Sequence, residues 1–221
     1  AMGRITKASG DYSTAMGNTT TASGLDSTAM GQGTTASGVN STAMGNLTTA
    51  TGIYSTAMGN STTASGYAST TMGFGTTASG QNSTAMGYNT TASDYGSLVI
   101  GQYNSSGSTV TTNGSATVFD PDNTAFVIGN GTENNANDAF KVDFSGKVTA
   151  TSFVGDGSQL TGISGGSLET VTEGGNIGYR LKEADTNKHG DIGKNALDLS
   201  IQDTASSTKG ATGENSIAMG K

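Results

Sequence analysis

The chain lacks cysteine and tryptophan, and it contains one proline and one histidine among its 221 residues. Without cysteine it can form neither a disulfide nor a thiolate metal site, and it offers no thiol nucleophile. No apolar run approaches the roughly 20 residues that span a bilayer, so we expect no membrane contact within this segment. Acidic residues outnumber basic ones by 17 to 10, which argues against a nucleic-acid partner.

Large apolar side chains are also scarce. Leu, Ile, Val and Phe together account for 32 of the 221 residues, a share that usually indicates disorder because it cannot build a normal core. Charged residues make up only 12% of the chain, however, so charge repulsion gives no reason for an extended state. Order maintained by repetition, with small side chains stacked in register, is the remaining explanation.

Glycine, by contrast, is abundant, and it recurs every seven positions from Gly3 to Gly101 with Asp94 as the one break. Residues 4–101 thus form fourteen heptads of two alternating kinds, which makes the true period 14 and gives seven units. A coiled coil is excluded because a glycine in every heptad and threonine at most fourth positions both disfavour a helix.

The columns of the repeat predict which way each side chain points. The third position alternates between Thr and Ser, the fifth is nearly always Ala, and the seventh is Gly. In a strand, positions three and five share one face, and their small side chains suit the interior of a thin coil. Glycine and the two variable positions after it would form the corner. We therefore predict an all-β fold, a parallel β-roll of 14-residue coils stacked about 4.8 Å apart.

The sixth position carries methionine in one kind of heptad and serine or threonine in the other. Stacked coils would align the methionines into an apolar ladder on the outer face, and a stripe of that length normally marks an interface. An intramolecular core stripe is the alternative, but the alanine column already fills the interior. We predict a homo-oligomer packed along the ladder, with an interface made by Met16, Met30, Met44, Met58, Met72, Met86 and Ile100.

The unit x-x-Ser-Thr-Ala-Met-Gly-x-x-Thr-Thr-Ala-Ser-Gly resembles the YadA-type head repeat of trimeric autotransporter adhesins, most closely at 40–45, 82–87 and 215–220. The resemblance covers residues 1–101 and 210–221, and threonine replaces the family's usual valine at the fourth position. It implies a left-handed roll and a homotrimer with the methionine column on the threefold side. It also implies an outer-membrane-anchored parent chain that is displayed on the bacterial surface and adheres to host matrix, glycans or other cells.

The repeat ends at residue 101, and we predict three further segments. Residues 102–166 form a β-rich connector, 167–209 form a charged, neck-like connector, and 210–221 begin a second run of head repeats. Short pieces within 150–162 are weakly similar to connector motifs of bacterial surface and phage tail fibres.

Within the first connector, residues 140–144 and 147–153 flank Ser145-Gly146 and predict a β-hairpin with a tight turn. Residues 124–129 are a further strand candidate. The apolar content comes mainly from five phenylalanines, which we expect in an interchain core: Phe119, Phe126, Phe140, Phe144 and Phe153.

Catalysis has little support in the residues. The repeat region holds three carboxylates, Asp11, Asp26 and Asp94, whereas a glycosidase needs two that share one face. His189 lies near Asp191 but has no placed nucleophile, so we interpret it as an exposed connector residue. Residues 120–123 have the opening spacing of a calcium loop without its later ligands, which favours a turn. We predict no enzyme, no cofactor and no metal site.

Aromatic side chains occupy several corners of the repeat. They could stack on sugars or enter the pockets of a partner, and packing between neighbouring coils is the alternative interpretation. This possible ligand surface consists of Tyr12, Tyr54, Tyr67, Phe74, Tyr88 and Tyr95.

The sequence as a whole predicts a structural and adhesive segment of a trimeric extracellular fibre, with a matrix protein or a glycan as its ligand. One alternative is the shaft of a phage or tailocin tail fibre, located on the virion. An ice-binding solenoid is a third hypothesis, but the outer ladder mixes serine with threonine instead of repeating threonine strictly.

Overall fold

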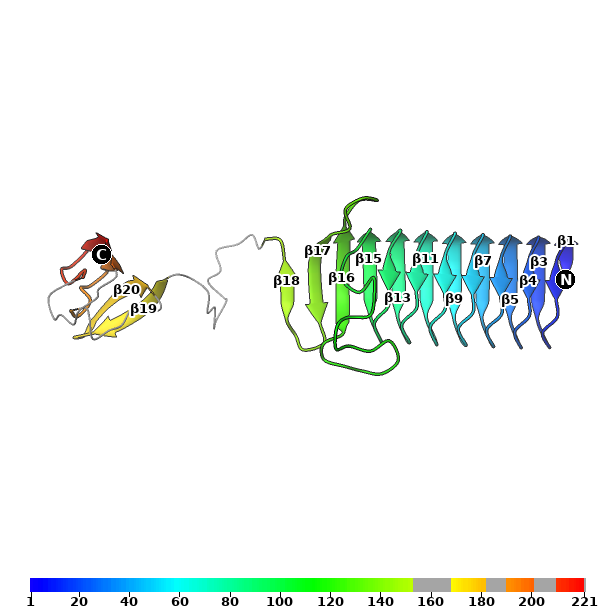
Figure 1. Ribbon diagram of the computed structural model, residues 1–221, viewed down its shortest axis with the longest axis horizontal. Coiled ribbons are helices and arrows are strands. Elements are labelled where there is room, and N and C mark those ends of the chain that lie inside the picture. The colour runs from blue at the N-terminus through cyan, green and yellow to red at the C-terminus, as the bar shows by residue number, and fades with distance from the viewer. Residues whose placement is uncertain (153–167, 182–189, 201–209, 221) are drawn as a thin grey trace. The chain divides into compact units, whose positions relative to one another are not determined.

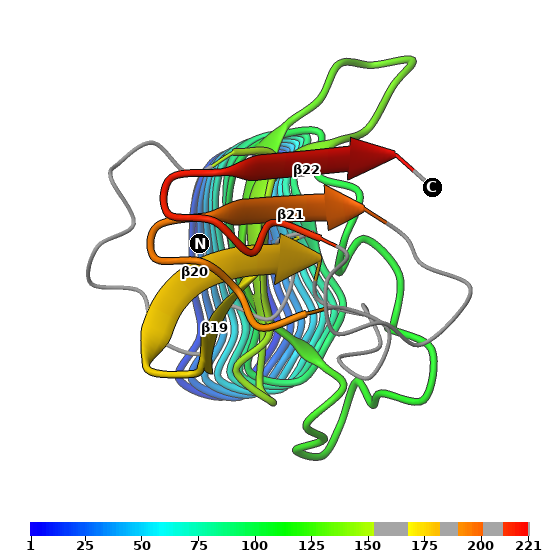
Figure 2. The same ribbon diagram turned by 90° about the vertical axis from the view of Figure 1, so that its left-hand side faces the viewer.

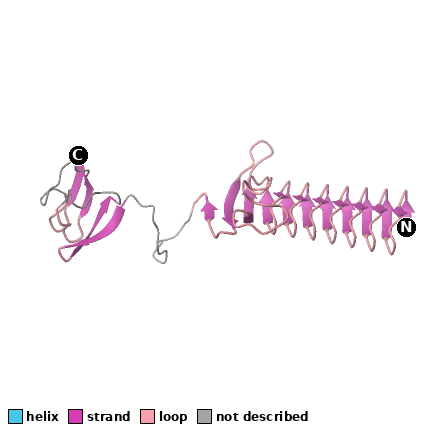
Figure 3. Ribbon diagram, turned by 60° about the horizontal axis from the view of Figure 1, so that its bottom comes forward, coloured by secondary structure: helices cyan, strands magenta, loops and turns pink. Residues whose placement is uncertain are grey.

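The computed structural model describes residues 1–152, 168–181, 190–200 and 210–220, and it divides into two compact units, Ala1–Val154 and Gly155–Lys221. All regular secondary structure in these ranges is strand (Figure 3), which confirms the all-β prediction. It follows that the described ranges contain no helix long and apolar enough to cross a membrane. The predictions made for Phe153, for most of 150–162 and for His189 lie outside the described residues.

Two sheets run along the first unit (Figure 1). The larger has eleven strands in the order β1 (Met2–Arg4), β3 (Thr14–Asn18), β5 (Thr28–Gln32), β7 (Thr42–Asn46), β9 (Thr56–Asn60), β11 (Thr70–Phe74), β13 (Thr84–Tyr88), β15 (Leu98–Gln102), β16 (Thr124–Asn130), β17 (Asp138–Asp143) and β18 (Val148–Ala150). The smaller has seven two-residue strands, β2 (Lys7–Ala8), β4 (Thr21–Ala22), β6 (Thr35–Ala36), β8 (Thr49–Ala50), β10 (Thr63–Ala64), β12 (Thr77–Ala78) and β14 (Thr91–Ala92).

The pairing register equals the sequence period. Met30 pairs with Met44 in the larger sheet and Thr35 pairs with Thr49 in the smaller one, so each residue faces its equivalent 14 positions later. From β1 to β16 the larger sheet is parallel, as is the whole smaller sheet. The 14-residue parallel β-roll that the sequence predicts is confirmed.

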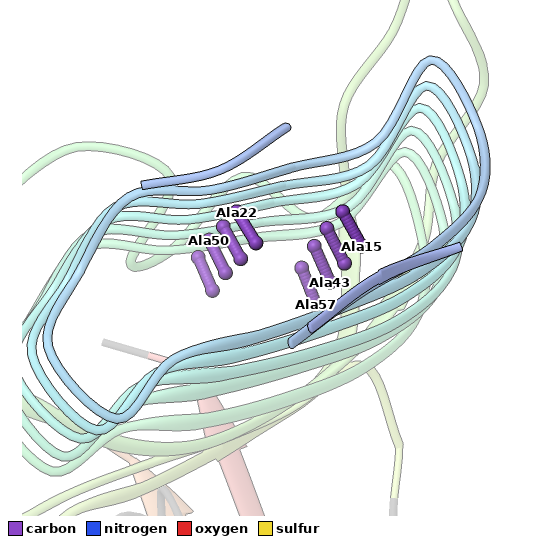
Figure 4. Close-up of a cluster of buried hydrophobic side chains, with 8 residues drawn as sticks. Ala15, Ala22, Ala43, Ala50 and Ala57 are labelled. Carbon is purple, nitrogen blue, oxygen red and sulfur yellow. The ribbon is translucent and has the colours of Figure 1, made fainter. Parts of the chain in front are cut away.

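The interior is as thin as the small residues require. From the second coil onward, the fifth-position residues of both sheets are fully buried, and Figure 4 shows Ala15, Ala43 and Ala57 facing Ala22 and Ala50 across the coil. Thr71 and Val99 replace alanine in this column and are also buried. The core therefore consists of methyl groups from two facing walls, in place of the large side chains that the chain lacks.

Third-position hydroxyls behave differently on the two walls. On the larger-sheet side, serine donates back to a glycine carbonyl three residues earlier, as Ser55 Oγ does to Gly52 O at 2.7 Å. On the smaller-sheet side, a column of fully buried threonine hydroxyls has no hydrogen-bond partner among the described residues: Thr20, Thr34, Thr48, Thr62, Thr76 and Thr90. The smaller-sheet wall thus carries a continuous column of unpaired hydroxyls, whereas the larger-sheet wall has only two isolated ones among the described residues, those of Ser41 and Thr71.

This contrast predicts opposite effects of two hydroxyl deletions. Thr48→Val replaces an unpaired buried hydroxyl by a methyl of similar shape, and we expect it to stabilise the roll by about 1 kcal/mol because a desolvated hydroxyl is removed. Ser55→Ala removes a bonded hydroxyl and should cost about 1 kcal/mol. Thermal unfolding of the two variants beside the parent chain measures both. A loss of stability in Thr48→Val would mean that its hydroxyl is paired.

The corners are built from strained backbone. The second corner residue adopts a left-handed conformation in every coil, with φ between 43° and 67°, and most of these residues are not glycine. They include Tyr12, Leu47 and Tyr54, although bulky side chains ordinarily avoid this region. Stacking of successive coils imposes the conformation, because each corner N–H bonds to a carbonyl of the coil before it, as Leu47 N–H does to Gln32 O at 2.8 Å.

Asp94 breaks the glycine series where the smaller sheet ends. Its carboxylate is fully buried and accepts hydrogen bonds from Thr111 N–H at 2.7 Å, Thr111 Oγ1 at 2.6 Å and Thr124 N–H at 2.8 Å. At Gly80, one coil earlier, a Cβ would lie 2.1 Å from the backbone oxygen of Asp94. Asp94 can carry a side chain because a different segment, 104–124, crosses the end of the roll.

The side-chain amide of Asn104 pairs with the edge of β14 as the backbone of a neighbouring strand would. Its Oδ1 accepts from Thr91 N–H and its Nδ2 donates to Thr91 O, both at 2.8 Å. Gly107 O accepts from Ser93 N–H, also at 2.8 Å. The polar edge of the smaller sheet is therefore satisfied by a loop, and no further strand is added to it.

Replacing the buried carboxylate tests this cap. Asp94→Asn places an amide N–H beside groups that donate to Asp94, and we expect it to destabilise the first unit by about 2 kcal/mol, the usual value of a hydrogen bond to a charged group. Asp11→Asn, at an exposed corner, is the matched control and should change stability by less than about 0.5 kcal/mol. Equal melting temperatures for the two variants would contradict the capping role.

The β-hairpin predicted in the connector is confirmed. β17 pairs antiparallel with β18, with Phe140 opposite Ala150, and Gly146 in the turn has a φ of 87°. Asp143 accepts from Ser145 Oγ at 2.6 Å, and this hydrogen bond lowers the pKa of the Asp143 carboxyl. The strand candidate at 124–129 corresponds to β16. All three strands extend the larger sheet of the roll, so the connector continues the roll on one side.

The second unit contains β19 (Leu168–Glu173), β20 (Asn176–Leu181), β21 (Leu197–Ser200) and β22 (Ile217–Gly220). β19 and β20 form an antiparallel hairpin, and β20, β21 and β22 are parallel neighbours (Figure 2). Asn195 and Asn215 have the left-handed corner conformation of the roll, with φ of 55°. Ser216 Oγ donates to Gly213 O at 2.6 Å, as the serines of the first roll do. Coil geometry thus resumes here.

A buried arginine occupies the second unit where the first roll has alanine. Arg180 pairs in register with Asp198, which in turn pairs with Ala218. Its guanidinium binds the Glu173 carboxylate through two hydrogen bonds of 2.7 and 2.9 Å and donates to Gly190 O at 3.0 Å. An ion network therefore fills the space at this end of the second unit.

Candidate functional site

The methionine ladder lies on the outer face of the larger sheet. Register pairs Met2 with Met16 and continues coil by coil to Met86. In the single chain Met16, Met30, Met44, Met58, Met72 and Met86 are each partly exposed, as is Ile100. The sequence predicts these side chains outside the core, and the fully buried alanines on the opposite face of the same strands agree with this. Their role as an interface stays a prediction.

The fourth-position threonines form the second column of this face. Residues such as Thr42 and Thr56 stand two positions before each methionine and are also partly exposed. A copy packed on the ladder would therefore meet one apolar and one hydroxyl-bearing column. Threonine here can hydrogen-bond across an interface or to water, where valine could only pack.

The corner aromatics fall on two opposite edges of the flattened coil. Tyr12, Tyr54, Tyr67 and Tyr95 occupy the corner that leads into the larger sheet, whereas Phe74 and Tyr88 occupy the corner that leads out of it. Tyr54 and Tyr67 pack edge to face at 5.4 Å, and Phe74 and Tyr88 stack at 5.0 Å with an angle of 9° between their planes. The structure thus brings together two pairs, and neither pair includes Tyr12 or Tyr95.

Tyr103 packs against the second pair and was not among the predicted ligand residues, since the register partner of Tyr88 is Gln102. Its ring lies 5.5 Å from that of Tyr88, and a side-chain hydrogen bond with Tyr103 is the main cause that raises the pKa of Tyr88. Tyr103 stands 14 residues after the corner residue Asn89, and this spacing could have indicated a further corner position although the last complete heptad ends at residue 101. Phe74, Tyr88 and Tyr103 form a continuous, partly exposed row of ring contacts that we name the aromatic edge.

A pocket of about 250 Å³ opens at the end of the roll, lined by Ser105, Ser106, Asn137, Asp138, Lys141 and Thr149–Thr151. Asp138 accepts from the backbone N–H groups of Ser105 and Ser106 and therefore holds the loop in place. Among the residues that the structure describes, no three His, Cys, Asp or Glu side chains cluster closely enough to bind a metal ion. The 120–123 segment forms the turn expected for it, with Asp122 N–H donating to Asp120 Oδ1 at 2.9 Å.

An alanine-filled parallel β-roll with an apolar ladder on one outer face defines a β-solenoid repeat protein. A family model described as YadA head domain repeat (2 copies) matches residues 1–21, 22–48, 50–76, 78–104 and 211–221, just over half of the chain. The chain belongs to this family of head repeats. YadA-type domains are homotrimeric and their family is one of bacterial cell-surface adhesins. No curated protein matches the chain.

Proposed function

We propose that this chain is an adhesive head segment of a homotrimeric autotransporter fibre, with the methionine ladder at the trimer interface and the corner columns facing ligand. The ladder is the observation that carries the proposal. It comprises Met16, Met30, Met44, Met58, Met72, Met86 and Ile100, one apolar side chain per coil in strict register and partly exposed in the single chain. Apolar stripes of this length on soluble proteins mark association surfaces.

The ligand surface that we propose is aromatic. Four residues of the Tyr54–Tyr67 pair and the aromatic edge, Tyr54, Tyr67, Phe74 and Tyr88, are 44–52% exposed. Tyrosine combines an apolar ring with a hydroxyl donor and acceptor, which suits both sugars and protein surfaces. We infer that the ligand is a glycan or a matrix protein at the host or cell surface.

An array of glycans and extracellular matrix proteins, probed with the whole chain, tests the adhesive function. We expect binding that falls at least tenfold in Tyr54→Ala with Tyr67→Ala. Thr49→Ala with Thr63→Ala, on the outer face of the smaller sheet, is the matched control and should bind as the parent does. Binding that survives the tyrosine substitutions would place the ligand elsewhere, and no binding at all would leave the segment as a spacer.

A further inference from the structure

The outer face of the larger sheet changes composition where the head repeat ends. Register continues the methionine ladder into Ile128, Phe140 and Ala150, one residue from each of the last three strands. The threonine column beside it is continued by apolar residues instead. These two rows on β15 to β18 form a surface that we name the apolar end face: Leu98, Ile100, Phe126, Ile128, Phe140, Val142, Val148 and Ala150.

This face is not part of the interior of the single chain. The residues that alternate with it, Val99 and Val127, are fully buried on the opposite side of the same strands. By contrast Leu98 is 36% and Val148 46% exposed, and the other six are partly exposed. The rings of Phe126 and Phe140 lie 6.0 Å apart, in the middle strands of the face. Eight apolar side chains on four adjacent strands therefore lie open on one side.

Its occupant follows from continuity with the ladder. Both lie on the same face of one uninterrupted sheet, and the row through Ile100 and Ile128 is the ladder itself. Copies of the chain that pack along the methionines must therefore also meet at the end face. There the threonine hydroxyls of the roll are absent, so both columns can exclude water.

We propose that the apolar end face binds the same face of the other copies of this chain and forms a dry clamp that holds the trimer at the end of the head. The proposal rests on the proposed trimeric function and adds to it a region that the head-repeat family model does not match, residues 105–152. In the roll the interface alternates apolar and hydroxyl columns, whereas in the clamp it is apolar throughout. The clamp would therefore contribute most of the resistance to dissociation.

Single cysteines test the clamp cleanly because the chain has none of its own. Ile128→Cys probes the end face, Met58→Cys probes the roll ladder, and Lys147→Cys, in the exposed hairpin turn, is the control. After mild oxidation with copper phenanthroline, we expect covalent dimers on non-reducing gels from the first two variants and none from the third.

The outcomes separate the clamp from the trimer. If Met58→Cys cross-links and Ile128→Cys does not, the clamp is overturned and the end face has another occupant. The proposed trimer stands in that case. Cross-linking of Ile128→Cys alone supports the clamp and removes the ladder from the interface. If neither variant cross-links and the chain is monomeric, both the clamp and the proposed trimer are wrong.

A second pair of variants measures the strength of the clamp. Phe126→Ser with Phe140→Ser should raise the concentration at which the trimer dissociates at least tenfold while the circular dichroism spectrum remains that of β-structure. Val118→Ser removes a 60% exposed apolar side chain that is not on the face and should leave dissociation unchanged. Unchanged dissociation in the double variant would overturn the clamp.

Discussion

Met44→Asp combined with Met58→Asp is expected to abolish the trimer. Burial of a methionine side chain contributes about 1.5–3 kcal/mol, and the double variant removes two of them from each of three chains. It also brings the carboxylates of the three copies close together in the proposed interface, where like charges repel. We expect sedimentation to show monomer or aggregate where the parent chain gives a trimer.

The matched control uses the other outer face of the same coils. Ser37→Asp with Thr51→Asp introduces the same charges at the sixth position of successive coils, directly after β6 and β8 of the smaller sheet, where both side chains are exposed. This variant should remain trimeric, because the proposed interface does not include that face. An identical loss of mass in both variants would show that charge alone, and not the ladder, breaks the assembly.

Gly45→Ala is expected to unfold part of the roll. A Cβ at this position would lie 2.0 Å from the backbone oxygen of Gly59 in the next coil, and the backbone φ of 122° is one that L side chains rarely adopt. Neither neighbour can move without breaking the coil register. Strain and overpacking together should cost about 2–6 kcal/mol, a fall in Tm on the order of 10 °C, measurable by circular dichroism.

Gly33→Asn tests the effect of a positive φ alone, without the contact to the backbone of the next coil that Gly45→Ala creates. Gly33 has a φ of 63°, and the added Cβ would meet a methyl of the Leu47 side chain at 2.8 Å, which can rotate away. The equivalent position four coils later carries Asn89 in a similar conformation, with a φ of 48°. We expect a change within about 1 kcal/mol. If Gly33→Asn is as damaging as Gly45→Ala, coil stacking does not explain the glycine series.

The repeat could be predicted from the sequence because every residue of a coil meets its own equivalent. A period of 14 then fixes both the register and the face of each column, as Met30 and Met44 illustrate. The outward direction of the methionines followed from strand alternation alone. What the single sequence could not supply is how many copies meet along them, since that depends on surfaces and not on register.

The end of the roll could not be predicted, because there side chains make the hydrogen bonds that the backbone of a further strand would otherwise make. Asn104 pairs with Thr91 through its amide, and the Asp94 carboxylate binds a segment 17 to 30 residues away in sequence. Such contacts do not recur at a fixed spacing, so no repeat in the sequence reveals them. The second unit differs for a similar reason, since its coils pair Leu197 with Ile217 over 20 residues, and Arg180 takes the place of a small residue.

The mass of the chain in solution tests the threefold ladder most directly. Sedimentation equilibrium of the unmodified protein at micromolar concentration should give three times the chain mass of 21.9 kDa. The same mass should persist in high salt, because apolar burial is not screened by ions. A single-chain mass under these conditions would contradict the assignment of Met16 to Met86 as the surface where the copies meet.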